Sequence, residues 1–307
     1  MINENLEPML HNNSATLRNL KVRSASQNFW FSIMWLAGLI TLVVLLLVLG
    51  YVIVQGGKAV NWEFLTTAPR GGLSGEGGIS TTLGTTVYLV IITLLIATPL
   101  GVGAAIYLIE YAGEQGLTSP IMRVLISITN FAVETLAGIP SIIFGLFGYA
   151  LFVSTLRFGW SLLSASLAGA CLVLPTVIRT TEEALLTVPD DYRRGSLALG
   201  ATKWQTLYKV VLPAGLPGII TGIILSVGRI ISETAVFFVT LGGSHRLPTS
   251  IMEGGRTLAL HLYYLAMDTN AFDKAMGTGA VLVILIILIN LTINIISSKL
   301  TAKVRGG

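Results

Sequence analysis

Six long apolar runs constrain this chain more than any other feature of its sequence. A helix that crosses a bilayer needs about 20 mostly apolar residues, and each run approaches or exceeds that length. Four of the runs hold no charged residue. The pattern predicts an all-α, polytopic membrane protein with six transmembrane helices. The runs are Phe29–Gln55, Thr82–Ile109, Ser127–Thr155, Ser161–Ile178, Leu212–Leu241 and Gly277–Ser298.

Charge is scarce and unevenly distributed along the chain. Only 11% of the 307 residues are charged, against roughly a quarter in an ordinary soluble domain. Six spans put both termini on one side, where twelve lysines and arginines lie, against six on the other side. Because cytoplasmic loops are enriched in Lys and Arg, we expect cytoplasmic termini and a multi-pass protein of the cell (inner or plasma) membrane. The net charge of +4 follows from this bias and indicates no nucleic-acid partner.

The chain divides into a polar N-terminal tail, residues 1–28, and a transmembrane domain, residues 29–307. The first apolar run lacks a small-residue cleavage site, which favours an uncleaved anchor over a signal peptide. Cys171 is the single cysteine, and we interpret it as a small buried apolar side chain. The chain has no phosphate-cradling GxxxxGK[ST], no HExxH, no paired CxxC and no GxSxG motif. These absences disfavour an enzyme and a bound metal or cofactor.

The fifth run carries two charges near its middle, Arg229 and Glu233. At about 100° per residue, a continuous helix would place them on one narrow face with small and hydroxyl residues, and Ser232 at its edge. The residues of this face are Gly218, Gly222, Ser226, Arg229, Glu233 and Thr240.

Two interpretations of this face stay open. It is a packing seam of small residues held by an internal ion pair, or it lines a substrate path. A central charge costs about 2.5–3.5 kcal/mol on insertion scales, so charges inside a membrane usually mark a path. We favour the path, with Arg229 as the group that meets an anion. Glu134 in the third run is a further candidate, either as a partner of Arg229 or as a repulsive element.

The cytoplasmic segment from 183 to 213 predicts two short helices. Asp190 is placed to cap the first helix, and Gly200 to end it in a left-handed turn. Thr202 begins the second helix, with Gln205 completing a capping box, and Pro213 stands at the start of the fifth span. The hairpin either fits a groove of another protein or packs on the spans of this chain.

Two other segments carry local signals. GIPS at 138–141 predicts a kink within the third span. GRTLALHLYYLAM, Gly255–Met267, is apolar but too short to span, and it predicts a surface or re-entrant helix. We expect His245 and His261 of the external loop to be solvated or interfacial.

The hairpin sequence RGSLALGATKWQTLYKVVLP resembles the EAA loop of ABC importer permeases. Gly200 takes the glycine position of that pattern, and Leu212 and Pro213 take its terminal pair. The chain departs from the pattern at its start, where Arg194, Gly195 and Ser196 replace Glu-Ala-Ala. The resemblance implies a coupling loop over about residues 182–213 that contacts an ATPase through Arg194, Gly195, Ser196, Leu199, Gly200, Ala201, Thr202 and Trp204.

Three further stretches resemble the A-type permease of phosphate-specific (Pst) ABC importers. They are AGIPSIIFGLFGYALFV at 137–153, GRIISETA at 228–235 and GRTLALHLYYLA at 255–266. The family implies a type I ABC importer permease fold and inward transport of inorganic phosphate. Its partners are a second permease subunit in a heterodimer, two ATPase subunits that use ATP, and an extracytoplasmic phosphate-binding protein. The path residues that we predict, from the projected face of the fifth run and from the charge in the third, are Arg229, Glu233, Ser226, Ser232, Thr240 and Glu134.

Other functions remain as alternatives. In the first alternative, the substrate is another oxyanion, such as sulfate, molybdate or phosphonate, since a single arginine does not distinguish tetrahedral oxyanions by charge. A second alternative is an ion-coupled transporter or channel that acts alone. A third is a membrane assembly factor whose charged face only packs against a partner.

Overall fold

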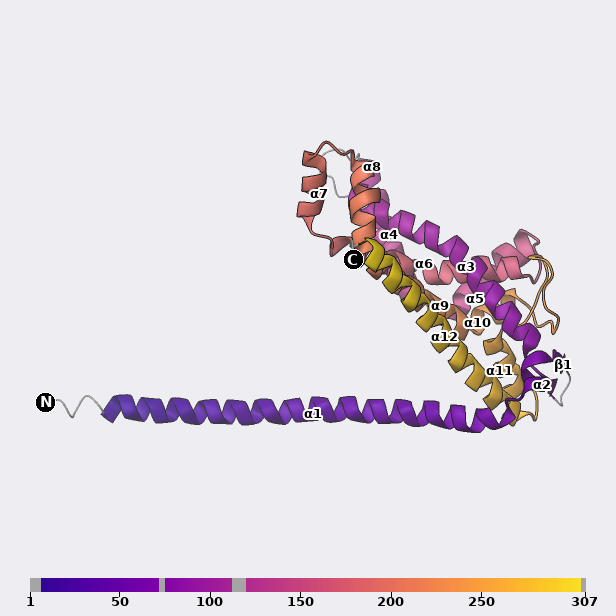
Figure 1. The fold of residues 1–307 in the computed structure, drawn as a ribbon, viewed down its shortest axis with the longest axis horizontal. Coiled ribbons are helices and arrows are strands. Elements are labelled where there is room, and N and C mark those ends of the chain that lie inside the picture. Colours follow the sequence, from indigo (N-terminus) through magenta and orange to yellow (C-terminus); the bar gives the residue numbers. More distant parts are fainter. Residues whose placement is uncertain (1–6, 72–74, 112–119, 305–307) are drawn as a thin grey trace. The chain divides into compact units, whose positions relative to one another are not determined.

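The computed structural model describes residues 7–71, 75–111 and 120–304, and it is almost entirely helical (Figure 1). The chain divides into two compact units, Met1–Val54 and Gln55–Gly307. The first unit is formed by helix α1, Glu7–Ala59, up to Val54. The large apolar side chains of α1 from Phe29 to Val48 are exposed. A helix that is apolar on all sides is suited to a lipid environment.

The second unit contains the remaining helices and one small strand pair. Its elements are α2 (Trp62–Thr66), β1 (Pro69–Gly71), β2 (Glu76–Gly77), α3 (Ser80–Ile106), η1 (Tyr107–Tyr111), α4 (Pro120–Gly138), α5 (Ser141–Gly148), η2 (Tyr149–Thr155), α6 (Leu162–Leu186), α7 (Asp190–Ala198), α8 (Lys203–Thr206), η3 (Leu207–Val211), α9 (Leu212–Ser232), α10 (Ala235–Thr240), α11 (Leu258–Met267) and α12 (Phe272–Val304). The η segments are short π-helical turns.

The number of candidate spans agrees with the sequence analysis. Within the described residues, five helices are long and apolar enough to cross a membrane, and a bent helix pair brings the number to six. Helix α6 is the most buried of the five and packs against α3, α5 and α9. Close packing is visible where Gly101 of α3 lies against Val177 of α6, since a Cβ at Gly101 would come within 2.7 Å of Val177. The core lies around α6.

The third span is broken rather than kinked. Its two helical parts, Ile126–Ala137 and Ser141–Thr155, meet at 111°. Pro140 stands at the break with extended backbone (ψ 136°) and has no N–H to continue the first helix. The predicted kink at 138–141 is confirmed, and the change of direction is larger than a proline kink alone requires.

The fifth span differs most from the expectation. Helix runs without interruption from Lys203 to Ser232, and a short separate helix, α10, follows. The α-helix α9 itself begins at Leu212 with Pro213 in its first turn, as predicted, and α8 and η3 precede it without a break. The π-helical turn η3 precedes Pro213, and such local adjustments satisfy backbone groups that a proline leaves free.

The two ends of the second unit carry different structures. The hairpin of α7 and α8 lies at one end of the helix bundle, and α2, β1 and α11 lie at the opposite end (Figure 1). Helix α11 starts after Thr257, whose hydroxyl accepts a hydrogen bond from the Leu260 N–H at 3.2 Å. The helix predicted within Gly255–Met267 is confirmed. His261 on α11 is only 5% exposed, so of the two predicted surroundings, solvated or interfacial, the solvated one is wrong there.

Candidate functional site

Arg229 lies in the last turn of α9 and is exposed. Its positive charge stands near the negative end of the helix dipole, which is a favourable position. Within the described residues, its side chain takes part in no hydrogen bond or ion pair. The arginine is therefore held by its helix, and its guanidinium is available to another group.

Glu233 does not continue the helical face that carries Arg229. Its backbone is extended (φ −75°, ψ 129°), because α9 ends at Ser232. Its carboxylate accepts hydrogen bonds from the N–H groups of Ala235 at 3.1 Å and Val236 at 3.4 Å. The predicted single face is therefore wrong for Glu233 and for Thr240, which lies on α10, and Arg229 and Glu233 form no ion pair.

The hydroxyl residues predicted on this face separate into two kinds. Ser226 and Thr240 are fully buried, and their hydroxyls donate to the carbonyls of Gly222 at 2.9 Å and Val236 at 2.8 Å. Ser232 is exposed and donates to Gly228 O at 2.9 Å. Of these three hydroxyl residues, only Ser232 is exposed on α9, as Arg229 is.

The small residues of α9 form the packing seam that was one of the two interpretations. A Cβ on Gly218 would come within 2.5 Å of Ala184, and Gly222 lies directly against Thr180. Both neighbours belong to α6. The two interpretations thus apply to different parts of one helix, since the glycines pack on α6 and Arg229 does not.

Glu134 lies exposed on α4. No hydrogen bond or ion pair within the described part of the chain includes its carboxylate. The structure does not bring Glu134 into an ion pair with Arg229, so the first of the two roles predicted for Glu134 is not seen within this single chain.

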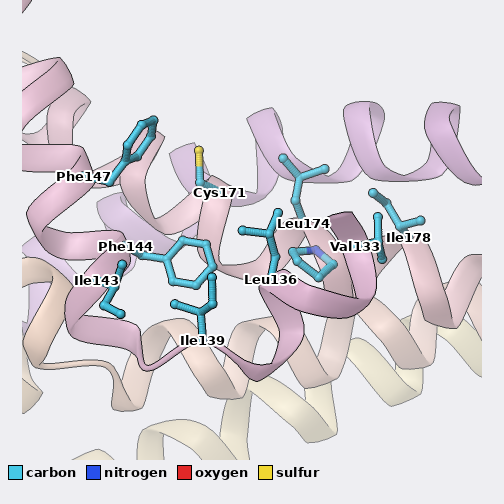
Figure 2. A pocket seen from close by; sticks show the side chains of 10 residues that line it. Val133, Leu136, Ile139, Ile143, Phe144, Phe147, Cys171, Leu174 and Ile178 are labelled. Carbon is cyan, nitrogen blue, oxygen red and sulfur yellow. The ribbon is translucent and has the colours of Figure 1, made fainter. Parts of the chain in front are cut away.

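An apolar pocket of about 470 Å³ lies beside these elements, between α4, α5 and α6 (Figure 2). Phe144, Leu136, Leu174 and Cys171 are among the residues that line it. Cys171 was predicted to be a small buried apolar side chain, and it is only partly buried. A lining with almost no polar surface offers nothing to an anion.

The coupling hairpin agrees closely with its sequence prediction. Gly200 has φ 84°, and Thr202 and Gln205 form the expected capping box. Asp190 is the first residue of α7 and not its cap, which is Pro189. The tip is exposed, with Leu199 at 91% and Trp204 at 63%.

The remaining predicted coupling residues surround this tip. Arg194, Gly195 and Thr202 are exposed, whereas Ala201 is half-buried. The Ser196 hydroxyl lies 2.9 Å from that of Thr206, so Ser196 joins the two helices of the hairpin.

Sequence reasoning missed the residue that holds the hairpin in place. Arg193 forms an ion pair with Glu110 at the end of η1, with its Nη2 and Nε at 2.8 and 3.0 Å from Oε1. It also donates to the carbonyls of Leu185 at 2.9 Å and Val188 at 2.7 Å. The only sequence signal was an acidic residue directly after the second apolar run.

The sequence and the fold match known transport proteins. Residues 97–306 match the family described as "Binding-protein-dependent transport system inner membrane component". The chain belongs to this family. It is therefore a multi-pass membrane protein and a permease component, not an enzyme by itself.

Individual relatives of the family cover nearly the whole chain. The "Phosphate transport system permease protein PstA" of Mycobacterium leprae is 36% identical over 289 residues, which cover 91% of each chain. The "Probable ABC transporter permease protein YqgI" of Bacillus subtilis is 34% identical and covers 82% of this chain and 90% of its own. A chain of the inward-facing MetNI methionine ABC transporter aligns with a TM-score of 0.53 at 21% identity, over 74% of this chain and 94% of that one. The last likeness supports the type I permease fold.

Proposed function

We propose that this chain is a permease subunit of an ATP-driven importer of inorganic phosphate. The observation that carries the proposal is Arg229, an exposed arginine without a partner in the described residues, placed where the fifth span breaks. Relatives at 34–36% identity whose names state phosphate transport support the choice of substrate.

Arg229 has the chemistry that this function needs. A guanidinium offers paired donors in a rigid fork that fits the oxygens of phosphate. In lipid, an unpaired arginine costs about 2.5–3.5 kcal/mol, so the surface around Arg229 faces a second permease subunit and a wet path. Ser232 and Glu134 are exposed and available to that path, and Glu233 shapes the break. Buried Ser226 and Thr240 support the helices.

The coupling hairpin supports the ATP-driven part of the proposal. Its exposed tip, Leu199 and Trp204, would otherwise leave two large apolar side chains in water. An exposed apolar tip of this kind suits a groove on a partner ATPase subunit. The ATP belongs to those two ATPase subunits, and this chain binds no cofactor. An extracytoplasmic phosphate-binding protein delivers the substrate to the opposite end, and the termini and hairpin are cytoplasmic.

Uptake of radiolabelled phosphate by the complete complex in proteoliposomes tests the proposal. We expect Arg229→Gln to reduce ATP-dependent uptake by about tenfold or more, as for the loss of a charge-assisted bidentate contact. Arg229→Lys keeps the charge without the fork and retains partial uptake. The matched control Arg246→Gln, an exposed arginine of a surface loop, transports as the parent does.

Three results would contradict the proposal. One is unchanged uptake by Arg229→Gln. Another is loss of complex assembly in that variant, which would make Arg229 a packing residue. The third is uptake by this chain alone, driven by an ion gradient. Competition by sulfate or molybdate in the same assay identifies a different oxyanion as substrate.

A further inference from the structure

A polar pocket, distinct from the apolar pocket described above, lies at the end of the bundle opposite the coupling hairpin. It measures about 260 Å³ and is formed by the β1–β2 pair, the loop before α11, and α11 itself. Its basic side chains are His245, Arg256 and His261, and its acidic ones are Glu76 and Asp268. The pocket is separate from Arg229, which is not part of its lining.

Arg256 is held in one orientation at this pocket. Its Nη2 donates to the Gly243 carbonyl at 2.9 Å, and its guanidinium lies 4.2 Å from the centroid of the Tyr264 ring. Its Nη1 lies 3.5 Å from Nδ1 of His261. Its Nε is buried and has no hydrogen-bond partner within the described residues. A buried donor without an acceptor is uncommon and indicates an absent partner.

Among the described residues, acidic groups offset the charge of Arg256 only in part: burial lowers its pKa, whereas Tyr264 and Asp268 raise it. None of the ion pairs formed among the described residues includes it. Asp268 and Glu76 are both exposed and lie at the rim. A half-buried guanidinium is normally paired or bound to an anion. His245 adds a second buried atom without a partner, its Nδ1.

Lys274 adds to the positive field around the pocket. Its ammonium donates to the carbonyls of Gly75 at 3.0 Å and Gly77 at 3.4 Å. Burial lowers the pKa of His261 to about 3, with the charges of Arg256, His245 and Lys274 adding to this effect. His261 is therefore neutral at physiological pH, and a bound anion would favour its protonation.

We propose that this pocket binds inorganic phosphate before it reaches Arg229, with Arg256 as the main ligand and His245 and His261 beside it. The proposal rests on phosphate import as the function. It gives the chain a second anion site, at the end of the bundle where a binding protein would release its substrate. A small tetrahedral oxyanion supplies acceptors for the free Nε of Arg256 and for a ring N–H of each histidine.

Binding and transport are measured separately to test this site. The complete membrane complex, without the binding protein, is placed in nanodiscs, and binding of radiolabelled inorganic phosphate is measured by rapid filtration. We use an Arg229→Gln background, so that remaining binding reports the second pocket. In that background Arg256→Gln weakens binding by about tenfold or more, and Arg246→Gln does not change it.

A second readout does not depend on how the Arg256 variant folds. In the otherwise unchanged complex, phosphate raises the unfolding temperature more at pH 5.5 than at pH 7.5, because anion binding favours protonated His261. His261→Gln removes this difference between the two pH values. Equal shifts in the unchanged complex and in His261→Gln overturn the proposal.

Other outcomes are also decisive. Unchanged phosphate binding in Arg256→Gln overturns the second site. So does weaker attachment of the binding protein with phosphate binding intact, because the pocket is then a protein contact. Failure of phosphate import as the function appears instead as absent ATP-dependent uptake in the unaltered complex, whatever the pocket binds.

Discussion

Among the described residues, His261 is the one whose pKa burial shifts most strongly from its ordinary value. Burial lowers its pKa to about 3, whereas an exposed histidine has a pKa of about 6.5. A group with a depressed folded-state pKa binds protons more readily when the chain is unfolded. Its effect on stability is absent above pH 6.5 and becomes destabilising as the pH falls from 6.5 towards 3.

Thermal unfolding of the complex measures this effect in phosphate-free buffer. Between pH 6.5 and 5 we expect a loss of up to about 1.4 kcal/mol per pH unit from this one group. His261→Asn removes the titration and flattens the profile. The groups facing His261 are Arg256, His245 and Lys274. His245→Asn is the comparison variant, because burial and the Arg256 charge also lower the pKa of this half-buried histidine. Equal slopes in the parent and in His261→Asn would refute the assignment.

At the scale of elements, the ion pair between Arg193 and Glu110 joins the coupling hairpin to the end of α3 and η1. Both side chains are largely buried, at 18% and 10% exposure. Arg193→Met leaves the Glu110 charge unpaired and also removes the bonds to two carbonyls. We expect it to lower the free energy of unfolding by about 3–5 kcal/mol.

Glu110→Gln keeps those carbonyl bonds and has a smaller effect. A double-mutant cycle on the unfolding of the complex isolates the coupling energy of the pair. ATPase stimulation by substrate, measured in the same variants, shows whether the hairpin still transmits its signal. Additive effects of the two substitutions would mean that the pair does not act as one unit.

The elements also show what the sequence could and could not predict. The hairpin was predictable because its signals are local: a left-handed glycine at 200 and a capping box between Thr202 and Gln205. The end of α9 at Ser232 carries no proline and no glycine, so apolar periodicity continues across it. Glu233 ends the helix by binding the N–H groups of the next one. A helical projection assumes a continuous helix, so it does not predict that Glu233 ends one helix and binds the N–H groups of the next.

At the scale of the whole molecule, charge bias predicts which end of the bundle is cytoplasmic. The single native cysteine, Cys171, makes this testable, since Cys171→Ser leaves a chain free of thiols. In that background we expect a membrane-impermeant maleimide to label Met252→Cys in intact cells. We expect Leu199→Cys to be labelled only after the cells are permeabilised. The labelling is done in cells without the ATPase subunits, because the ATPase would cover the hairpin tip. Both exposed positions lie outside the spans, and the reverse pattern would invert the topology.

Overall architecture was more predictable than the arrangement of the site. The six apolar runs and the positions of their helices need only length and hydropathy, and both are properties of one segment at a time. The pocket around Arg256 depends on residues from 69 to 269 that meet only through folding. Neither apolar periodicity nor a short motif contains that information.

The two broken spans have a physical consequence for the surrounding membrane. Residues 139–140 and 233–234 interrupt helices, and the segments that follow, α5 and α10, pack together at Gly145 and Val236. Hydrocarbon offers no partner to the peptide groups that such breaks release. The Glu233 carboxylate accepts two of them, the N–H groups of Ala235 and Val236, and water or a neighbouring subunit must meet those that stay free. Where water is that partner, the breaks hydrate the membrane locally, and an ion that arrives there would keep part of its solvation shell.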